Sequence, residues 1–272
     1  MANERAVGLI GLGLVGRAIA ARLGEAGFDV LGYDVSPEAM RAFEGKATVE
    51  AKQAARIVLA VYDTPDVEQV AAEVKPKLLV NCVTCDPVRM EALAARLAGE
   101  GVRYVEAPLS GSSDAIRRGE STMFIGGDPS GCEDLLAAIT ANRRLVGPPG
   151  MALRAKLAIN LVLGLNRAAL AEGMAFAEAF GIPRATFLEL VRGSPVASSA
   201  ALAKGEKMVS GDYAPDSRIR QHLKDVRRIR EHARFALPLT EAHEKLLAAA
   251  VAAGDGELDN AAIILQYTRS QS

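Results

Sequence analysis

The sequence lacks tryptophan, and aromatic residues make up only 4% of its 272 residues. It has three cysteines, too few for the disulfide framework that stabilises small secreted domains. Lys and Arg number 32 and Asp and Glu number 33, so the formal net charge is -1 and no basic surplus exists for nucleic acid or an anionic membrane. We therefore expect small-molecule partners, with no nucleic acid and no membrane among them.

The sequence also lacks a long uncharged apolar run. Two asparagines, an arginine and two glutamates interrupt the longest candidate, residues 157–181, whereas a transmembrane helix needs about 20 nearly uncharged residues. No secretory or transit-peptide pattern precedes the first apolar run, Ala6–Ile10. We expect a cytoplasmic protein.

Cys82 and Cys85 form a C-x-x-C pair, which has two interpretations. It could be a redox pair or half of a zinc site, or simply two small apolar residues at a strand end. No second pair completes a metal site, and the three histidines lie far along the chain. We favour the apolar interpretation and expect no metal.

Up to about residue 150, short apolar runs alternate with stretches of helical periodicity. This alternation is typical of an α/β fold in which helices cover both faces of a doubly wound parallel sheet. We expect strands at Ala6–Ile10, Asp29–Tyr33, Arg56–Val61, Leu78–Cys82, Arg103–Ala107 and Thr122–Ile125, and helices at Leu14–Ala26, Pro37–Glu44, Asp66–Val74 and Pro87–Glu100.

The pattern changes after the segment Gly147-Pro148-Pro149-Gly150. From Met151 onward the chain is rich in Ala and Leu, reads as helix after helix, and shows no convincing strand. The sequence therefore predicts two domains, a Rossmann-type sheet domain over residues 1–150 and an all-α domain over residues 151–272.

A glycine-rich loop stands between the first predicted strand and the first predicted helix. Its first glycine permits a tight turn, the second lets the backbone approach a pyrophosphate, and the third allows close helix–strand packing. The phosphates would lie at the positive N-terminus of the helix. The loop predicts dinucleotide binding by Gly11, Leu12, Gly13, Leu14, Val15 and Gly16.

Asp34 lies at the end of the second predicted strand, 18 residues after Gly16. A carboxylate there can accept hydrogen bonds from the adenosine ribose hydroxyls and would repel a 2′-phosphate. Val35, Ser36 and Pro37 follow it, without an Arg or Lys. This favours NAD over NADP as the cofactor, although a generic helix-capping aspartate is the alternative interpretation.

Three later segments follow the glycine loop in order. They are Glu106-Ala107-Pro108-Leu109-Ser110-Gly111, with Gly119 and Gly126-Gly127 behind it, then Lys156-Leu157-Ala158-Ile159-Asn160, then Lys224-Asp225-Val226. With these motifs the chain resembles, over nearly its whole length, the β-hydroxyacid dehydrogenase family, whose best-known member oxidises 3-hydroxyisobutyrate. The resemblance implies hydride transfer between NAD and a small hydroxy acid.

Ser110 follows a proline after a strand that should end at the carboxyl edge of the sheet, where open α/β sheets bind ligands. Its hydroxyl and the backbone N–H groups of Gly111 and Ser112 would suit a carboxylate. An ordinary polar turn fits the spacing equally well. The resemblance favours substrate binding by these residues.

Lys156 and Asn160 are four residues apart, so they share one face of a helix that is otherwise apolar. A lysine there could extend to solvent, or it could exchange a proton with a ligand's hydroxyl or carbonyl. The resemblance to the family's catalytic segment favours Lys156 as the acid–base residue, with Asn160 holding the substrate or the lysine.

We expect three further residues near the cofactor. Thr84 is similar to the family's threonine beside the nicotinamide, and Val61 ends the strand predicted over 56–61. Lys224 should approach cofactor and substrate from the helical domain, or it is an ordinary surface lysine beside neighbouring arginines. We expect the basic stretch 218–234 to be a solvated helix face.

The chain departs from the family pattern near the expected substrate pocket. Ser112 and Ala152 stand where relatives commonly carry glycine, and the usual aromatic residue is missing before Lys224. Ser112 with Arg218 or Arg220 suggests a more hydroxylated or more anionic acid than 3-hydroxyisobutyrate, such as glycerate or threonate.

Two other functions remain open from the sequence. An imine reductase of the same superfamily would generally lack a lysine at the position of Lys156. A non-catalytic NAD-binding module would need neither Lys156 nor Ser110. The Ala- and Leu-rich helical domain, together with the resemblance, leads us to expect a homodimer or homotetramer.

Overall fold

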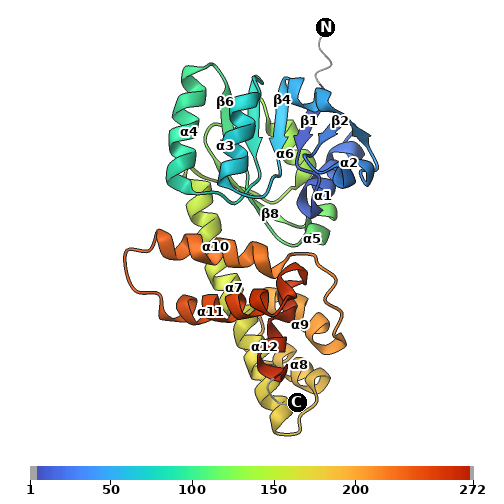
Figure 1. Cartoon of the computed structure of the whole chain (residues 1–272), viewed down its shortest axis with the longest axis vertical. Helices are drawn as coiled ribbons and strands as arrows, with labels where there is room; N and C mark the ends of the chain where they lie inside the picture. The colour runs from blue at the N-terminus through green and yellow to red at the C-terminus, as the bar shows by residue number, and fades with distance from the viewer. Residues whose placement is uncertain (1–4, 270–272) are drawn as a thin grey trace. The chain divides into compact units, whose positions relative to one another are not determined.

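The chain forms two compact units, Met1–Lys156 and Leu157–Ser272, and each is described by itself. The structure, a computed structural model, describes residues 5–269 (Figure 1). The first unit is a sheet with helices on both faces, and the second is helical. The predicted fold class, a Rossmann-type sheet followed by helices, is confirmed.

The sheet of the first unit has the strand order β3-β2-β1-β4-β5-β6-β8-β7, and β9 pairs with β8. The strands β1 to β6 are parallel, as predicted for all of them except β3, which the sequence did not indicate; β8 runs antiparallel to β6 and β7. The strands are β1 (Ala6–Ile10), β2 (Asp29–Tyr33), β3 (Lys46–Ala47), β4 (Arg56–Leu59), β5 (Leu78–Asn81), β6 (Arg103–Glu106), β7 (Leu109–Ser110), β8 (Thr122–Gly126) and β9 (Arg143–Gly147).

Each face of the sheet buries its own apolar core because side chains alternate along a strand. In β1, Val7 and Leu9 pack with α1, α5 and α6, while Ile10 packs on the other face with α3 and α4 (Figure 1). The helices are α1 (Leu14–Glu25), α2 (Pro37–Arg41), α3 (Thr64–Glu73), α4 (Pro87–Gly99), α5 (Ser113–Arg117) and α6 (Glu133–Ile139), with a 3-10 turn at Val49–Gln53.

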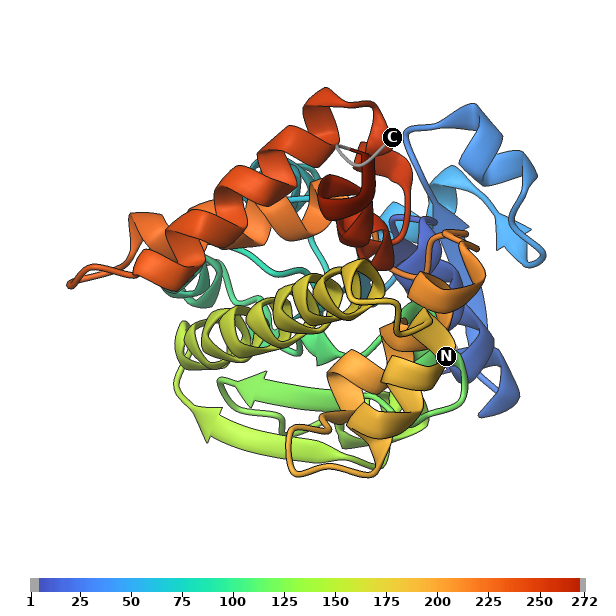
Figure 2. The same cartoon turned by 90° about the horizontal axis from the view of Figure 1, so that it is seen from below.

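The second unit continues from α7 (Met151–Ala179), which runs as one unbroken helix in Figure 2. Residues 157–269 contain no strand, and α10 and α11 lie side by side in both views. The remaining helices are α8 (Arg184–Arg192), α9 (Ser199–Ser210), α10 (Ile219–Glu231), α11 (Pro238–Ala252) and α12 (Leu265–Thr268), with 3-10 turns at Asp255–Glu257 and Asn260–Ile264.

The cysteines behave as apolar side chains. Cys82 and Cys132 pack in the core beside α1, and Cys85 packs in the opposite core. Burial raises the pKa of the Cys82 thiol to about 12 and that of Cys132 to about 11. In residues 5–269, no three His, Cys, Asp or Glu side chains gather as metal ligands, and no helix is long and apolar enough to cross a membrane.

Candidate active site

The glycine loop links β1 to α1 through a backbone that only glycine tolerates at two of its positions. Gly11 has φ +100, and a Cβ there would lie 2.4 Å from the carbonyl oxygen of Ala60. A Cβ on Gly16 would lie 1.9 Å from the carbonyl oxygen of Gly11. These contacts make the turn tight and bring α1 close to the sheet.

Gly13 differs from the other two glycines because a Cβ there would meet no atom within 4 Å. It precedes α1, and no side chain caps this helix end. The first N–H groups of a helix have no intrahelical partner, and they carry its positive dipole end. The loop therefore offers an open cradle at a helix N-terminus, which fits the pyrophosphate of a dinucleotide.

Asp34 follows β2 and fixes this loop from the side. Its Oδ2 accepts a hydrogen bond from the Leu12 N–H at 2.7 Å, and its Oδ1 accepts one from the Ser36 N–H at 2.8 Å. The cap of α2 is Ser36, whose Oγ accepts from the Ala39 N–H, so the helix-capping interpretation of Asp34 is wrong. Each carboxylate oxygen keeps a lone pair for a ribose hydroxyl.

Two further predicted cofactor residues follow the carboxyl ends of neighbouring parallel strands. Val61 lies just after β4, which ends at Leu59 and not at Val61 as predicted. Thr84 lies in the loop after β5, where the Asn81 Oδ1 accepts from the Val83 N–H at 2.9 Å. Because β1, β2, β4 and β5 are parallel, these loops and Asp34 share one edge of the sheet.

Ser110 lies in β7, a short strand that the sequence did not predict, and it pairs with Thr122 of β8. Gly111 has φ +149, and a Cβ there would meet side chains at 3.2 and 3.3 Å. The hydroxyl of Ser112 accepts a hydrogen bond from the Ala115 N–H at 3.2 Å and caps α5. One lone pair of Ser112 is therefore already engaged in holding the helix.

Lys156 lies in the second turn of α7 and is 7% exposed. One side of the first turn is buried as well, since Ala152 and Leu153 are both 0% exposed and Leu153 packs in the core beside α3 and α4. Lys156 thus belongs to a part of α7 that is fixed to the sheet unit. The side chain of Lys156 is therefore not extended into solvent.

Asn160 lies one helical turn after Lys156 and is 5% exposed. Its Nδ2 donates a hydrogen bond to the Oδ2 of Asp225 at 2.9 Å. The Nζ of Lys224 lies 3.4 Å from the Oδ1 of Asp225, and the Lys224 side chain is only 11% exposed. The structure brings these three residues together in the helical unit, and Lys224 is not an ordinary surface lysine.

The basic stretch 218–234 is only partly a solvated face, which corrects the prediction. Arg228 is 9% exposed and therefore lies inside the unit. The Nε atoms of Arg218 and Arg220 lie 3.0 and 3.1 Å from the carboxylate of Glu257. Since both guanidinium groups already face a carboxylate, the suggestion that they select a more anionic acid loses its support.

Sequence reasoning missed a pair of buried histidines in the helical unit. The Nε2 atoms of His222 and His243 lie 3.1 Å apart. A Cβ on Gly164 of α7 would lie 2.3 Å from the Nε2 of His222 and 3.0 Å from that of His243. The signal was a glycine inside a long predicted helix, which marks close packing.

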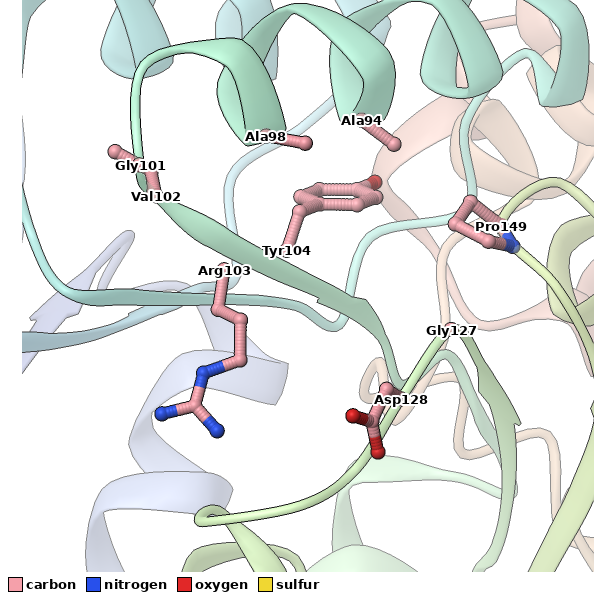
Figure 3. A pocket seen from close by; sticks show the side chains of 9 residues that line it. All are labelled: Ala94, Ala98, Gly101, Val102, Arg103, Tyr104, Gly127, Asp128 and Pro149. Carbon is pink, nitrogen blue, oxygen red and sulfur yellow. The ribbon is translucent and has the colours of Figure 1, made fainter.

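A hollow of about 390 Å³ opens on the sheet unit beside α4 and β6 (Figure 3). The ring of Tyr104 lies beneath Ala94 and Ala98 of α4, with Gly127 and Pro149 opposite. None of the predicted site residues lines it. The predicted catalytic and cofactor residues thus belong elsewhere in the fold.

Comparison with known proteins identifies the family. A family model described as the NAD binding domain of 6-phosphogluconate dehydrogenase matches residues 6–147. A second, described as NAD-binding of NADP-dependent 3-hydroxyisobutyrate dehydrogenase, matches residues 150–267. Together the two matches cover both units of the chain.

Individual relatives agree with this assignment. An L-threonate dehydrogenase of Cupriavidus necator is 30% identical over 96% of this chain and 95% of its own length. A 2-hydroxy-3-oxopropionate reductase of Escherichia coli is 28% identical over 95% of both chains. The crystal structure of a 3-hydroxyisobutyrate dehydrogenase from Salmonella typhimurium is 27% identical, with a TM-score of 0.85 over 96% of this chain and 99% of that one.

The fold, the glycine cradle and the two family matches define an oxidoreductase that binds NAD(P). The chain belongs to the β-hydroxyacid dehydrogenase family. The resemblance inferred from the motifs is therefore confirmed, as is the class of reaction, NAD(P)-linked oxidoreduction of a hydroxy acid.

Proposed function

We propose that this protein is an NAD-dependent dehydrogenase of a small β-hydroxy acid and that Lys156 is its acid–base residue. The observation that carries this proposal is the burial of Lys156 at 7% exposure, one helical turn before Asn160. An ammonium on a flexible stem, removed from bulk water, is suited to exchange a proton with a hydroxyl or carbonyl.

The cofactor would be held by the glycine loop, by Asp34 and by the loops that carry Val61 and Thr84. When bound, its nicotinamide supplies the acceptor or donor of the hydride. Asp34 supports NAD over NADP because its carboxylate would repel a 2′-phosphate. Val35, which follows it, is 84% exposed and offers no charge to attract one.

The substrate carboxylate would be held by the Ser110 hydroxyl and by the backbone N–H groups of Gly111 and Ser112. During oxidation the neutral amine of Lys156 takes the hydroxyl proton, while the hydrogen on the same carbon leaves with its electron pair. Asn160, fixed by Asp225, orients the substrate or the lysine, and Lys224 approaches the same substrate and the cofactor. During reduction the ammonium of Lys156 returns the proton.

The substrate class we propose is a polyhydroxylated acid of the glycerate or threonate type. The relatives named L-threonate dehydrogenase and 2-hydroxy-3-oxopropionate reductase support this choice. The additional hydroxyl of Ser112 supports it as well, because its O–H remains able to donate to a substrate oxygen while its oxygen caps α5.

We also propose that residues 1–150 bind the dinucleotide and that residues 151–272 serve substrate binding and assembly as a homodimer or homotetramer. Apolar side chains exposed on the helical unit support assembly. Phe176 and Phe180 are 66% and 73% exposed, and their ring centroids lie 4.8 Å apart. Light scattering on a Phe176→Ser, Phe180→Ser variant tests this, since a smaller assembly than that of the parent is expected.

The reaction itself is tested by reduction of NAD⁺ and of NADP⁺ with a panel of hydroxy acids. The proposal expects kcat/KM to be higher with NAD⁺ than with NADP⁺, and higher with threonate or glycerate than with 3-hydroxyisobutyrate. Turnover of 3-hydroxyisobutyrate above the polyhydroxylated acids would overturn the substrate class. Absence of turnover with every acid would favour a binding module.

A further inference from the structure

Glu106 is a carboxylate inside the sheet unit, at the last position of β6, and it is 0% exposed. Its Oε1 accepts a hydrogen bond from the Gly150 N–H at 2.7 Å. Burial has the largest effect on the pKa of this carboxylate and raises it, whereas the backbone N–H groups of Gly150, Leu153 and Ala152 lower it. The backbone at the start of α7 is thus bonded to a side chain from another element.

The start of α7 needs such a partner because the first N–H groups of a helix have no acceptor within it. The residue before a helix usually supplies one through Ser, Thr, Asp or Asn. Here that residue is Gly150, which follows two prolines. The acceptor comes instead from Glu106, 44 residues earlier in the chain.

The surroundings of Glu106 are shaped to admit its carboxylate. A Cβ on Gly126, in the neighbouring strand β8, would lie 2.6 Å from the Oε2 of Glu106 and 3.1 Å from the Cβ of Ala152. A larger residue at Gly126 would therefore displace the carboxylate from α7. Strands β6 and β8 together hold the first turn of this helix.

Lys156 lies one helical turn after this anchored segment, four residues beyond Ala152 and three beyond Leu153. We propose that Glu106 is a positioning residue for Lys156, because its hydrogen bond with the Gly150 N–H fixes the start of α7. This inference rests on the proposed role of Lys156 as the acid–base residue.

The chemistry of the Glu106 carboxylate indicates which substitution preserves its hydrogen bond with the Gly150 N–H. Burial, with a smaller contribution from the negative charge of Glu91, raises the pKa of Glu106 to about 7 even though the Gly150 N–H lowers it. A neutral side chain is therefore tolerated there, and glutamine retains an oxygen that accepts from Gly150. Leucine fills similar space but leaves the buried N–H of Gly150 without an acceptor.

The experiment compares Glu106→Gln and Glu106→Leu with a matched control, Glu91→Leu. Glu91 contacts the same helix through Arg154, but this pair lies at the surface, with both side chains 41% exposed. For each full-length variant, kcat, KM and the Kd for NADH are measured. Hydrogen exchange of the peptide spanning 150–156 is recorded in parallel.

We expect Glu106→Leu to lower kcat at least about tenfold, since small misplacements of a catalytic group have effects up to about 100-fold. The Kd for NADH should stay within about twofold of the parent, because the glycine loop lies on other strands. Amides 150–153 should exchange faster. Glu106→Gln should restore both kcat and protection, and Glu91→Leu should change neither.

Equal kcat losses in Glu106→Leu and Glu91→Leu, or no rescue by Glu106→Gln, would overturn the proposal. If Glu106→Leu fails to fold, Glu106→Asp replaces it. Aspartate withdraws the carboxylate by one methylene, so kcat should fall without loss of NADH binding. An unchanged kcat in that variant overturns the positioning role. If the parent oxidises no hydroxy acid, the proposed function fails separately. Hydrogen exchange then still decides whether Glu106 holds the start of α7 in place. Unchanged protection of amides 150–153 in Glu106→Leu would show that it does not.

Discussion

Replacing Gly13 by alanine should weaken cofactor binding while leaving the protein folded. The backbone at Gly13 has φ -70 and ψ -165, an extended conformation open to any residue, and a Cβ would meet nothing within 4 Å. Alanine is a poorer residue than glycine before a helix, at a cost of about 0.5 to 1 kcal/mol. The same open space must admit the pyrophosphate, so a methyl group there should raise the Kd for NADH at least about tenfold, or about 1.4 kcal/mol.

Two other glycines of the same region serve as references. A Cβ on Gly16 must move away from the Gly11 carbonyl oxygen, from 1.9 Å to about 3.4 Å, so Gly16→Ala should destabilise the fold by about 3 kcal/mol. Gly24 lies inside α1 with nothing within 4 Å. Gly24→Ala should therefore stabilise the protein by up to about 1 kcal/mol and leave the Kd unchanged.

Urea unfolding followed by circular dichroism measures the stability of the three variants, and titration with NADH measures their affinity. The account requires Gly13→Ala to lose affinity for NADH while losing no more than about 1 kcal/mol of stability. An unchanged Kd in this variant would refute the assignment of the open space to the cofactor. A loss of stability as large as that of Gly16→Ala would refute the claim that alanine fits there.

Two predictions concern the helical unit. Gly164→Ala should destabilise the protein by about 2 to 3 kcal/mol in urea unfolding, because its Cβ would lie 2.3 Å from the buried Nε2 of His222. Burial, with a smaller contribution from Arg167, lowers the pKa of His243 to about 4. The unfolded chain therefore binds the extra proton between about pH 6.5 and pH 4, so the free energy of unfolding should fall by up to about 3 kcal/mol as the pH is lowered through that range. His243→Gln should flatten this fall, and an unchanged slope would contradict the assignment to His243.

Much of the sheet unit could be predicted because its local signals agree with its fold. The strands β1 and β2 and the helix α1 between them were placed within one residue, since apolar runs and glycines mark their ends. β9 escaped detection because two arginines open it. The antiparallel direction of β8 could not be read at all, because side-chain alternation is the same in both directions.

The candidate site shows the same division between local and distant signals. Ser112 and Ser36 cap short helices through bonds to residues three positions ahead, a pattern visible in sequence. The partners of Asn160 and Glu106 are 65 and 44 residues away in the chain, and no spacing rule connects them. Asp225 stood in the Lys-Asp-Val motif, but only the fold shows that it orients Asn160.

The central claim is that Lys156 transfers the proton, and kinetics of Lys156→Ala test it most directly. Arg154→Ala is the matched control, because it removes a cation from the same helix at an exposed position. The account predicts that Lys156→Ala keeps the Kd for NADH within about twofold and loses at least about 100-fold in kcat with the best hydroxy acid, while Arg154→Ala stays near the parent. Retention of kcat in Lys156→Ala would contradict the account and assign the proton transfer to another residue.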